Sequence, residues 1–289
     1  MQTGAAPLSQ GVPRMTNPWV VVLSALFLWW FSTGAILWRV RRADRGGPYA
    51  HVWSVVGGLP LLVAGAYGFV ATRGDDSVFG VYISFLSALA IWGWIELAFL
   101  SGIITGPNTR PCPPHAAQFD RFVRAFGTIA WHELALFGAF VLMARLSVGV
   151  DNAVAVWTFM VLFFARISAK LNLFFGVPRI HTEFLPRPLA HMASHFRLAP
   201  MNWVFPVSVT ALSFGAACWM ERAYAATTEA SLVGFVFLAA LTVLALLEHW
   251  FMVLPLPDQK LWRWMLPDAV PAVFSKPSTA PARAGADTQ

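Results

Sequence analysis

Ionisable side chains lie inside two apolar stretches of the chain that are each long enough to cross a bilayer. His132 and Glu133 are adjacent in the first stretch, and Arg166, Lys170 and Asn172 share the second. A polar or ionisable group inside a membrane span is costly, so each of these residues is a candidate functional residue. Imidazole and carboxylate groups together can bind a metal ion, ligate the central ion of a tetrapyrrole, or relay protons.

Two further apolar stretches add acidic and imidazole groups at a similar depth. Glu96 lies in one of them, and Glu248 and His249 lie in the other. At a rise of 1.5 Å per residue, the whole set falls within roughly 12 to 14 Å of one membrane face. The candidate intramembrane cluster consists of Glu96, His132, Glu133, Arg166, Lys170, Asn172, Glu248 and His249. Within it, His132 and His249 are the candidate cofactor ligands.

Two interpretations of this cluster stay open. The carboxylates of Glu96, Glu133 and Glu248 could pair with Arg166 and Lys170 as buried salt bridges that fix helix packing. Alternatively, the histidines and carboxylates could form a metal, pigment or proton-relay site. The HExxH motif of metalloproteases is absent at the first pair, because Leu-Ala-Leu-Phe follows it. The Glu-x-x-His spacing of di-iron bundles is also absent at these places.

Composition predicts a polytopic membrane protein with an all-α fold. Of the 289 residues, 57% are hydrophobic and only 12% are charged, whereas about 25% are charged in soluble domains. The formal net charge of +6 does not indicate nucleic-acid binding, because the basic residues lie in short loops between apolar spans. Membrane lipid is therefore the expected environment, and no nucleic-acid partner is expected.

Seven apolar segments are predicted to be transmembrane helices, because each is near the roughly 20 residues that a bilayer requires. They are Trp19–Trp38, His51–Thr72, Phe79–Ile104, Phe126–Leu146, Ala153–Phe175, Trp203–Ala223 and Leu232–Val253. With the N-terminus outside, fourteen Lys and Arg residues face the inside and four face the outside. The positive-inside rule therefore places the C-terminus in the cytoplasm. Residues 1–18 are then a polar tail, 19–254 the membrane domain, and 255–289 a cytoplasmic tail with a disordered end.

The loop 176–202 holds three further histidines and four prolines. Leu185–Phe196 is predicted to be a short helix, since Pro188 suits a first helical turn. His191 and His195 are four residues apart and would share one face of an α-helix. We expect that face to lie on the membrane surface rather than to bind a metal.

Several motifs in order resemble one known family, the photosynthetic complex assembly protein 2 family of the PuhE type. They are Trp30-Phe31-Ser32-Thr33-Gly34, Trp92-Gly93-Trp94 with Glu96, Thr105-Gly106-Pro107 followed by Pro111-Cys112-Pro113, His132-Glu133-Leu134, Arg166-Ile167-Ser168-Ala169-Lys170-Leu171-Asn172, Glu183-Phe184-Leu185-Pro186, and Pro200-Met201-Asn202 with Phe205-Pro206-Val207-Ser208-Val209-Thr210. The resemblance covers roughly residues 19–250. It implies a multi-pass protein of the bacterial inner membrane that is associated with reaction-centre genes and bacteriochlorophyll supply.

The expected function is therefore assembly of the reaction centre and light-harvesting complex, rather than catalysis. Reaction-centre or antenna subunits and other assembly factors are the partners that the resemblance implies. Bacteriochlorophyll or a biosynthetic precursor is the implied cofactor. The alternative is a membrane enzyme of tetrapyrrole modification, with a metal held by the carboxylates and histidines of the intramembrane cluster.

Overall fold

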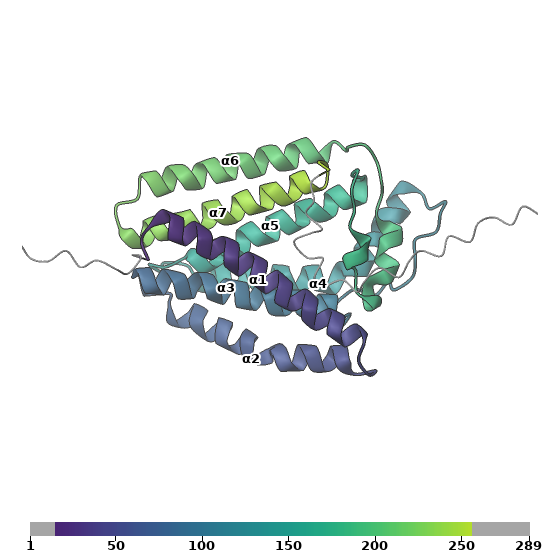
Figure 1. Ribbon diagram of the computed structural model, residues 1–289, viewed down its shortest axis with the longest axis horizontal. Coiled ribbons are helices and arrows are strands. Elements are labelled where there is room, and N and C mark those ends of the chain that lie inside the picture. The colour runs from purple at the N-terminus through teal and green to yellow at the C-terminus, as the bar shows by residue number, and fades with distance from the viewer. Residues whose placement is uncertain (1–14, 256–289) are drawn as a thin grey trace, which may run out of the picture.

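Seven long helices form one bundle in the computed structural model, which describes residues 15–255 (Figure 1). The expected tails lie almost wholly in 1–14 and 256–289, outside the described residues. The helices are α1 Pro18–Asp44, α2 Ala50–Ala71, α3 Val78–Leu100, α4 Gln118–Leu146, α5 Val154–Phe175, α6 Val204–Tyr224 and α7 Glu229–Phe251. Two 3₁₀ segments, η1 Thr182–Phe184 and η2 Arg187–His195, lie between α5 and α6. The all-α fold and the seven apolar spans are confirmed.

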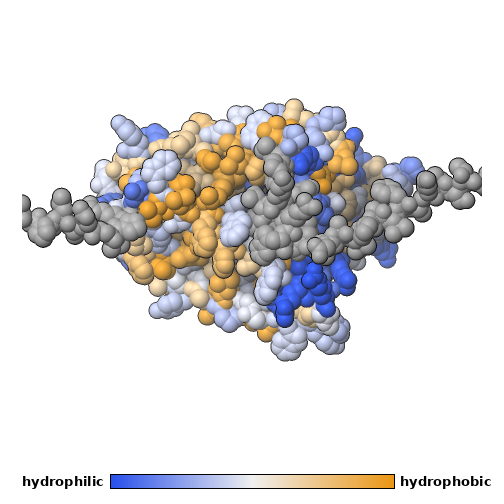
Figure 2. Space-filling model, in the orientation of Figure 1, coloured by the Kyte–Doolittle hydropathy of each residue, from blue (hydrophilic) through white to orange (hydrophobic). Residues whose placement is uncertain are grey.

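Helices α3 and α7 form the centre of the bundle. About half of the most apolar window of each is buried inside the protein, 50% for α3 and 56% for α7, against 17% to 33% for the other five helices. The outer helices leave large apolar side chains exposed, as a lipid-facing surface requires. Figure 2 shows this apolar surface as orange over the middle of the molecule.

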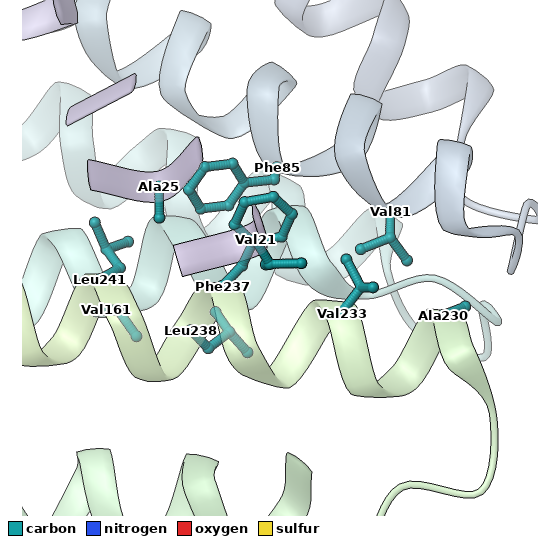
Figure 3. Close-up of a cluster of buried hydrophobic side chains, with 10 residues drawn as sticks. All are labelled: Val21, Ala25, Val81, Phe85, Val161, Ala230, Val233, Phe237, Leu238 and Leu241. Carbon is teal, nitrogen blue, oxygen red and sulfur yellow. The ribbon is translucent and has the colours of Figure 1, made fainter. Parts of the chain in front are cut away.

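Aromatic stacking fixes the core where four helices meet. Phe85 of α3 stacks on Phe237 of α7, with ring centroids 4.2 Å apart and planes at 14°. Val21 of α1 and Val161 of α5 belong to the same buried cluster (Figure 3). Stacked rings of this kind add to the energy of burial itself. The packing holds α5, which carries much of the candidate cluster, against the two central helices.

The long connections gather at one end of the bundle, which we call the loop end (Figure 1). There, η2 packs Leu189 and Met192 against Phe99 at the end of α3. Asp44 at the end of α1 accepts a hydrogen bond from the backbone N–H of Arg187, at 3.1 Å, and faces His51 Nε2 at 3.2 Å. The loop 176–202 is thus held against several helices.

The predicted helix boundaries agree with the structure within about four residues, except at two loop-end boundaries. Helix α4 begins at Gln118 rather than Phe126, and α1 continues to Asp44 rather than ending at Trp38. The additional turns of α4, residues 118–125, carry polar side chains that stabilise the helix, because Arg124 pairs with Asp120 one turn away at 2.8 Å. Because these turns are polar, a prediction based on apolar segments did not include them.

Candidate functional site

Two ion pairs connect α5 to its neighbours near the loop end. Arg166 Nη2 lies 3.1 Å from Glu96 Oε2 of α3. Lys170, one turn further along α5, pairs with Glu133 of α4. The Lys170 Nζ also lies 5.5 Å from the centroid of the Phe99 ring, a favourable cation–π position. Each cation of the cluster therefore has a carboxylate partner from a different helix.

His132 is fully buried beside these pairs. Its ring stacks on Phe99 with a centroid distance of 4.2 Å. Its Nε2 is 3.7 Å from Glu96 Oε1, beyond hydrogen-bond distance, and neither ring nitrogen has a hydrogen-bond partner within residues 15–255. The backbone of the Thr105 region positions this turn of α4, since the N–H of His132 donates to the Thr105 carbonyl at 3.0 Å.

Glu248 belongs to the same neighbourhood but has a different partner. Its Oε1 accepts a hydrogen bond of 2.9 Å from the indole N–H of Trp29. This contact joins α7 to α1. Glu248 also lines the same two cavities as Arg166, described below.

His249 and Asn172 are separated from this group and belong to a second network. His249 Nδ1 contacts the Ala245 carbonyl and its Nε2 contacts Ser168 Oγ, both at 2.8 Å. Asn172 donates to Ser208 Oγ of α6 at 2.9 Å and accepts from Asn202 Nδ2 at 3.1 Å. Both ring nitrogens of His249 are thus engaged, Nε2 in joining α7 to α5 and Nδ1 within α7 itself.

A cavity of about 700 Å³ lies between α4, α5, the ends of α3 and α7, and the loop 179–196. Its walls are mostly apolar, and seven phenylalanines line it: Phe99, Phe122, Phe126, Phe137, Phe163, Phe174 and Phe196. Charged side chains from the cluster interrupt this wall, among them Arg166, Lys170 and Glu133. Large apolar cavities with a few polar groups are the usual form of small-molecule sites.

A second cavity of about 340 Å³ lies between α1, α3, α5 and α7. Arg166 and Glu248 line both cavities, whereas Glu96 and Trp29 line only the smaller one. Arg166 therefore lies where the two cavities adjoin.

The structure places His195 in the wall of the larger cavity, which the sequence did not predict. The segment 187–195 is a 3₁₀ helix rather than an α-helix, so residues at i and i+3 share a face. Leu189, Met192 and His195 are accordingly buried together, whereas His191 is half-buried and does not line the cavity. The expectation that His191 and His195 share a surface face is wrong. The period-three pattern 189, 192, 195 is the signal that could have found this arrangement.

The described residues do not offer a site for a free metal ion. Within 15–255, no three His, Cys, Asp or Glu side chains are grouped so that they could hold one. His132 and His249 lie in different networks, and the carboxylates of Glu96 and Glu133 face cations. Four members of the cluster form two interhelical ion pairs, Glu96–Arg166 and Glu133–Lys170, beside an apolar cavity.

These features define a multi-pass helical membrane protein with a mostly apolar cavity whose wall carries a few charged side chains. The chain belongs to the family described as protein of unknown function DUF3623, whose model matches residues 15–272. It is 61% identical over 253 residues to a protein of Rhodobacter capsulatus named "Uncharacterized 30.4 kDa protein in puhA 5'region". That alignment covers 88% of this chain and 92% of the relative. No solved structure matched the chain.

Proposed function

We propose that the protein is an assembly factor for the photosynthetic reaction centre and light-harvesting complex, coupled to the supply or delivery of bacteriochlorophyll. The name of the Rhodobacter capsulatus relative places that protein in the 5' region of puhA, which supports a link to the photosynthetic locus. The motifs noted in the sequence, which run through α1 to α6, support the same function. The protein would lie in the bacterial inner membrane and contact reaction-centre or antenna subunits and other assembly factors.

The cavity of about 700 Å³ is the observation that carries this proposal. Its phenylalanine walls suit the body of a pigment or precursor, which is apolar and aromatic. Oxygen atoms on such a molecule would meet Arg166, whose Nε is buried and has no hydrogen-bond partner among residues 15–255. Bound in this way, a pigment would be kept within the membrane until a subunit receives it.

The enzyme alternative has less support from the geometry. It needs Glu96, His132, Glu133, Glu248 and His249 around one metal. The structure separates His249 from the others, and it pairs Glu96 and Glu133 with cations. No observation on the described residues favours a reaction at this cluster.

Complementation tests the proposal. The gene of the relative would be deleted in Rhodobacter capsulatus and replaced by this chain or its variants, and membrane absorption would report the assembled complexes. We expect deletion to lower the complexes without accumulation of a pigment intermediate. This chain should restore them, and Arg166→Gln should not. Arg145→Gln is the matched control, because Arg145 is exposed at the C-terminal end of α4, away from the loop end of the bundle.

Two results would contradict the proposal. Accumulation of one defined tetrapyrrole intermediate, seen by chromatography of extracted pigments, would favour the enzyme. An unchanged level of complexes in the deletion strain would remove the link to assembly.

A further inference from the structure

His195 is held rigidly in the cavity wall. The side chain is 3% exposed and lies on η2 beside the buried Leu189 and Met192. The Arg121 guanidinium donates hydrogen bonds to the backbone carbonyls of His195, at 2.7 Å, and Phe174, at 3.0 Å. The loop that carries His195 is therefore fixed to the ends of α4 and α5.

The hydrogen bonding of His195 determines which nitrogen carries a lone pair. Its Nε2 lies 3.3 Å from the Arg110 carbonyl, which can only accept, so Nε2 carries the proton. Its Nδ1 is buried and has no hydrogen-bond partner among the described residues. Burial also lowers the pKa of His195, so the imidazole is neutral near pH 7. A neutral histidine whose other nitrogen donates to a carbonyl is the usual state of a metal ligand.

One histidine nitrogen is enough to bind a metal ion that a small molecule already holds through its own ligands. A free ion generally needs three or four protein donors, and residues 15–255 contain no such group. A metal in the centre of a tetrapyrrole already has its equatorial nitrogens and needs only an axial ligand. The seven phenylalanines of the cavity match the apolar faces of such a ring.

We infer that the large cavity binds a planar metal-chelate ring of the metallotetrapyrrole class, with His195 as its axial ligand. This inference rests on the proposed function in taking the cavity as the pigment site. His195 lines the cavity, and its Nδ1 is the ring nitrogen without a partner among the described residues.

The other candidate histidines are less suited to this role. His132 and His249 are not among the residues that line the cavity, and both nitrogens of His249 are hydrogen-bonded. His181 does line the cavity, but its Nδ1 lies 3.2 Å from a carboxylate oxygen of Glu183. His195 thus replaces the two histidines that the sequence suggested as cofactor ligands.

Titration with two probes separates axial ligation from general binding. Zinc protoporphyrin and metal-free protoporphyrin would each be added to the full-length protein in mild detergent, with absorption and fluorescence as readouts. We expect the wild type to bind the zinc ring at least about tenfold more tightly than the metal-free ring. His195→Ala should abolish this difference and leave binding of the metal-free ring unchanged. Added imidazole should restore the spectrum of the ligated zinc ring in that variant.

His191→Ala is the matched control, since it removes a histidine from the same 3₁₀ helix but from outside the cavity. It should keep the preference for zinc. Retention of the preference in His195→Ala, or its absence in the wild type, would overturn the assignment of the ligand. If neither ring binds, the ring class itself is wrong. The assembly function is judged separately, by complementation.

Discussion

Arg166 has more hydrogen-bond donors than the described residues use. A guanidinium carries five N–H donors, and within residues 15–255 a single bond, to Glu96, is formed while Nε stays buried and unpaired. Because Arg166 lines both cavities, its remaining donors are available to a molecule in either one. We therefore propose Arg166 as the residue that binds an oxygen acceptor of the ligand.

Arg166→Gln should remove the preference for a ring that carries free carboxylates. We expect the wild type to bind protoporphyrin about tenfold more tightly than its dimethyl ester, because charge-assisted hydrogen bonds to a carboxylate are the stronger kind. The variant should bind both rings equally. Fluorescence titration measures both affinities, and a preserved preference would show that Arg166 does not contact the ligand.

Removing one charge of the Glu133–Lys170 pair should lower the free energy of unfolding more than replacing both charges by apolar side chains. Glu133→Gln leaves the Lys170 ammonium without a counter-charge and should lower the free energy of unfolding by about 3 kcal/mol. The double variant Glu133→Leu with Lys170→Met should recover most of that loss. Denaturation in micelles measures the three stabilities. A double variant less stable than the single one would show that the charges contribute more than packing.

Depth along a helix was predictable at this scale, but the direction of each side chain was not. The sequence placed the charged residues of the cluster at one level, and the structure joins Arg166 to Glu96 and, one turn away, Lys170 to Glu133. The same depth also grouped Asn172 and His249 with them, although these two face a different network. The position of a residue along its span predicts its depth in the membrane. The direction in which its side chain points depends on how the helix packs against its neighbours, which the sequence of one span does not predict.

At the scale of elements, the segment after α3 fits against α4 through a close backbone approach. Asn108 N–H donates to the Gly127 carbonyl at 3.0 Å. A Cβ on Gly106 would lie 2.1 Å from that same carbonyl oxygen, so only glycine fits there. This contact positions the turn of α4 that precedes His132.

Gly106→Ala should therefore separate the segment from α4 and lower the free energy of unfolding by about 1–3 kcal/mol. Gly138→Ala is the control, since a Cβ there meets nothing within 4 Å and alanine favours a helix. Thermal unfolding in detergent compares the two. Equal midpoints for both variants would show that the close approach does not constrain the fold.

The hydrogen bonds of Asn172 join α5 to α6 and to the loop before it. Asn172→Ala removes the donor to Ser208 and the acceptor for Asn202, so we expect a loss of about 1–3 kcal/mol in stability. Ser213→Ala, at an exposed position of α6, should change stability by less than about 0.5 kcal/mol. Denaturant titration measures both, and similar small effects would place Asn172 outside the stabilising contacts.

Apolar length predicted the existence of all seven helices, but η2 shows the limit of this approach. Pro188 correctly predicted the start of a helix near Arg187. The choice between α and 3₁₀ geometry depended on how Leu189 and Met192 pack against Phe99, a contact between residues about 90 positions apart. That contact joins distant parts of the chain, so the period-three spacing of residues 189, 192 and 195 was not recognised and the interior position of His195 was missed.

For the whole molecule, the proposed orientation places the loop end in the cytoplasm. A membrane-impermeant maleimide should label Asp151→Cys in intact spheroplasts and should label Arg110→Cys only after the membrane is opened. Arg110 lies in the loop before α4 and Asp151 in the turn before α5, at opposite ends of the bundle. Both variants would be made with Cys112 and Cys218 replaced by serine. The reverse labelling pattern would invert the topology.

Helix α5 carries contacts on two opposite sides. Arg166 and Lys170 face the ion pairs and the large cavity, while Ser168 and Asn172, about 200° further round at 100° per residue, bond to α7 and α6. If an occupant of the large cavity turned α5, the hydrogen bonds of Ser168 and Asn172 on its far side would transmit that movement to α7 and α6. A subunit docked on α6 or α7 would then respond to the filling of the cavity without touching the bound molecule.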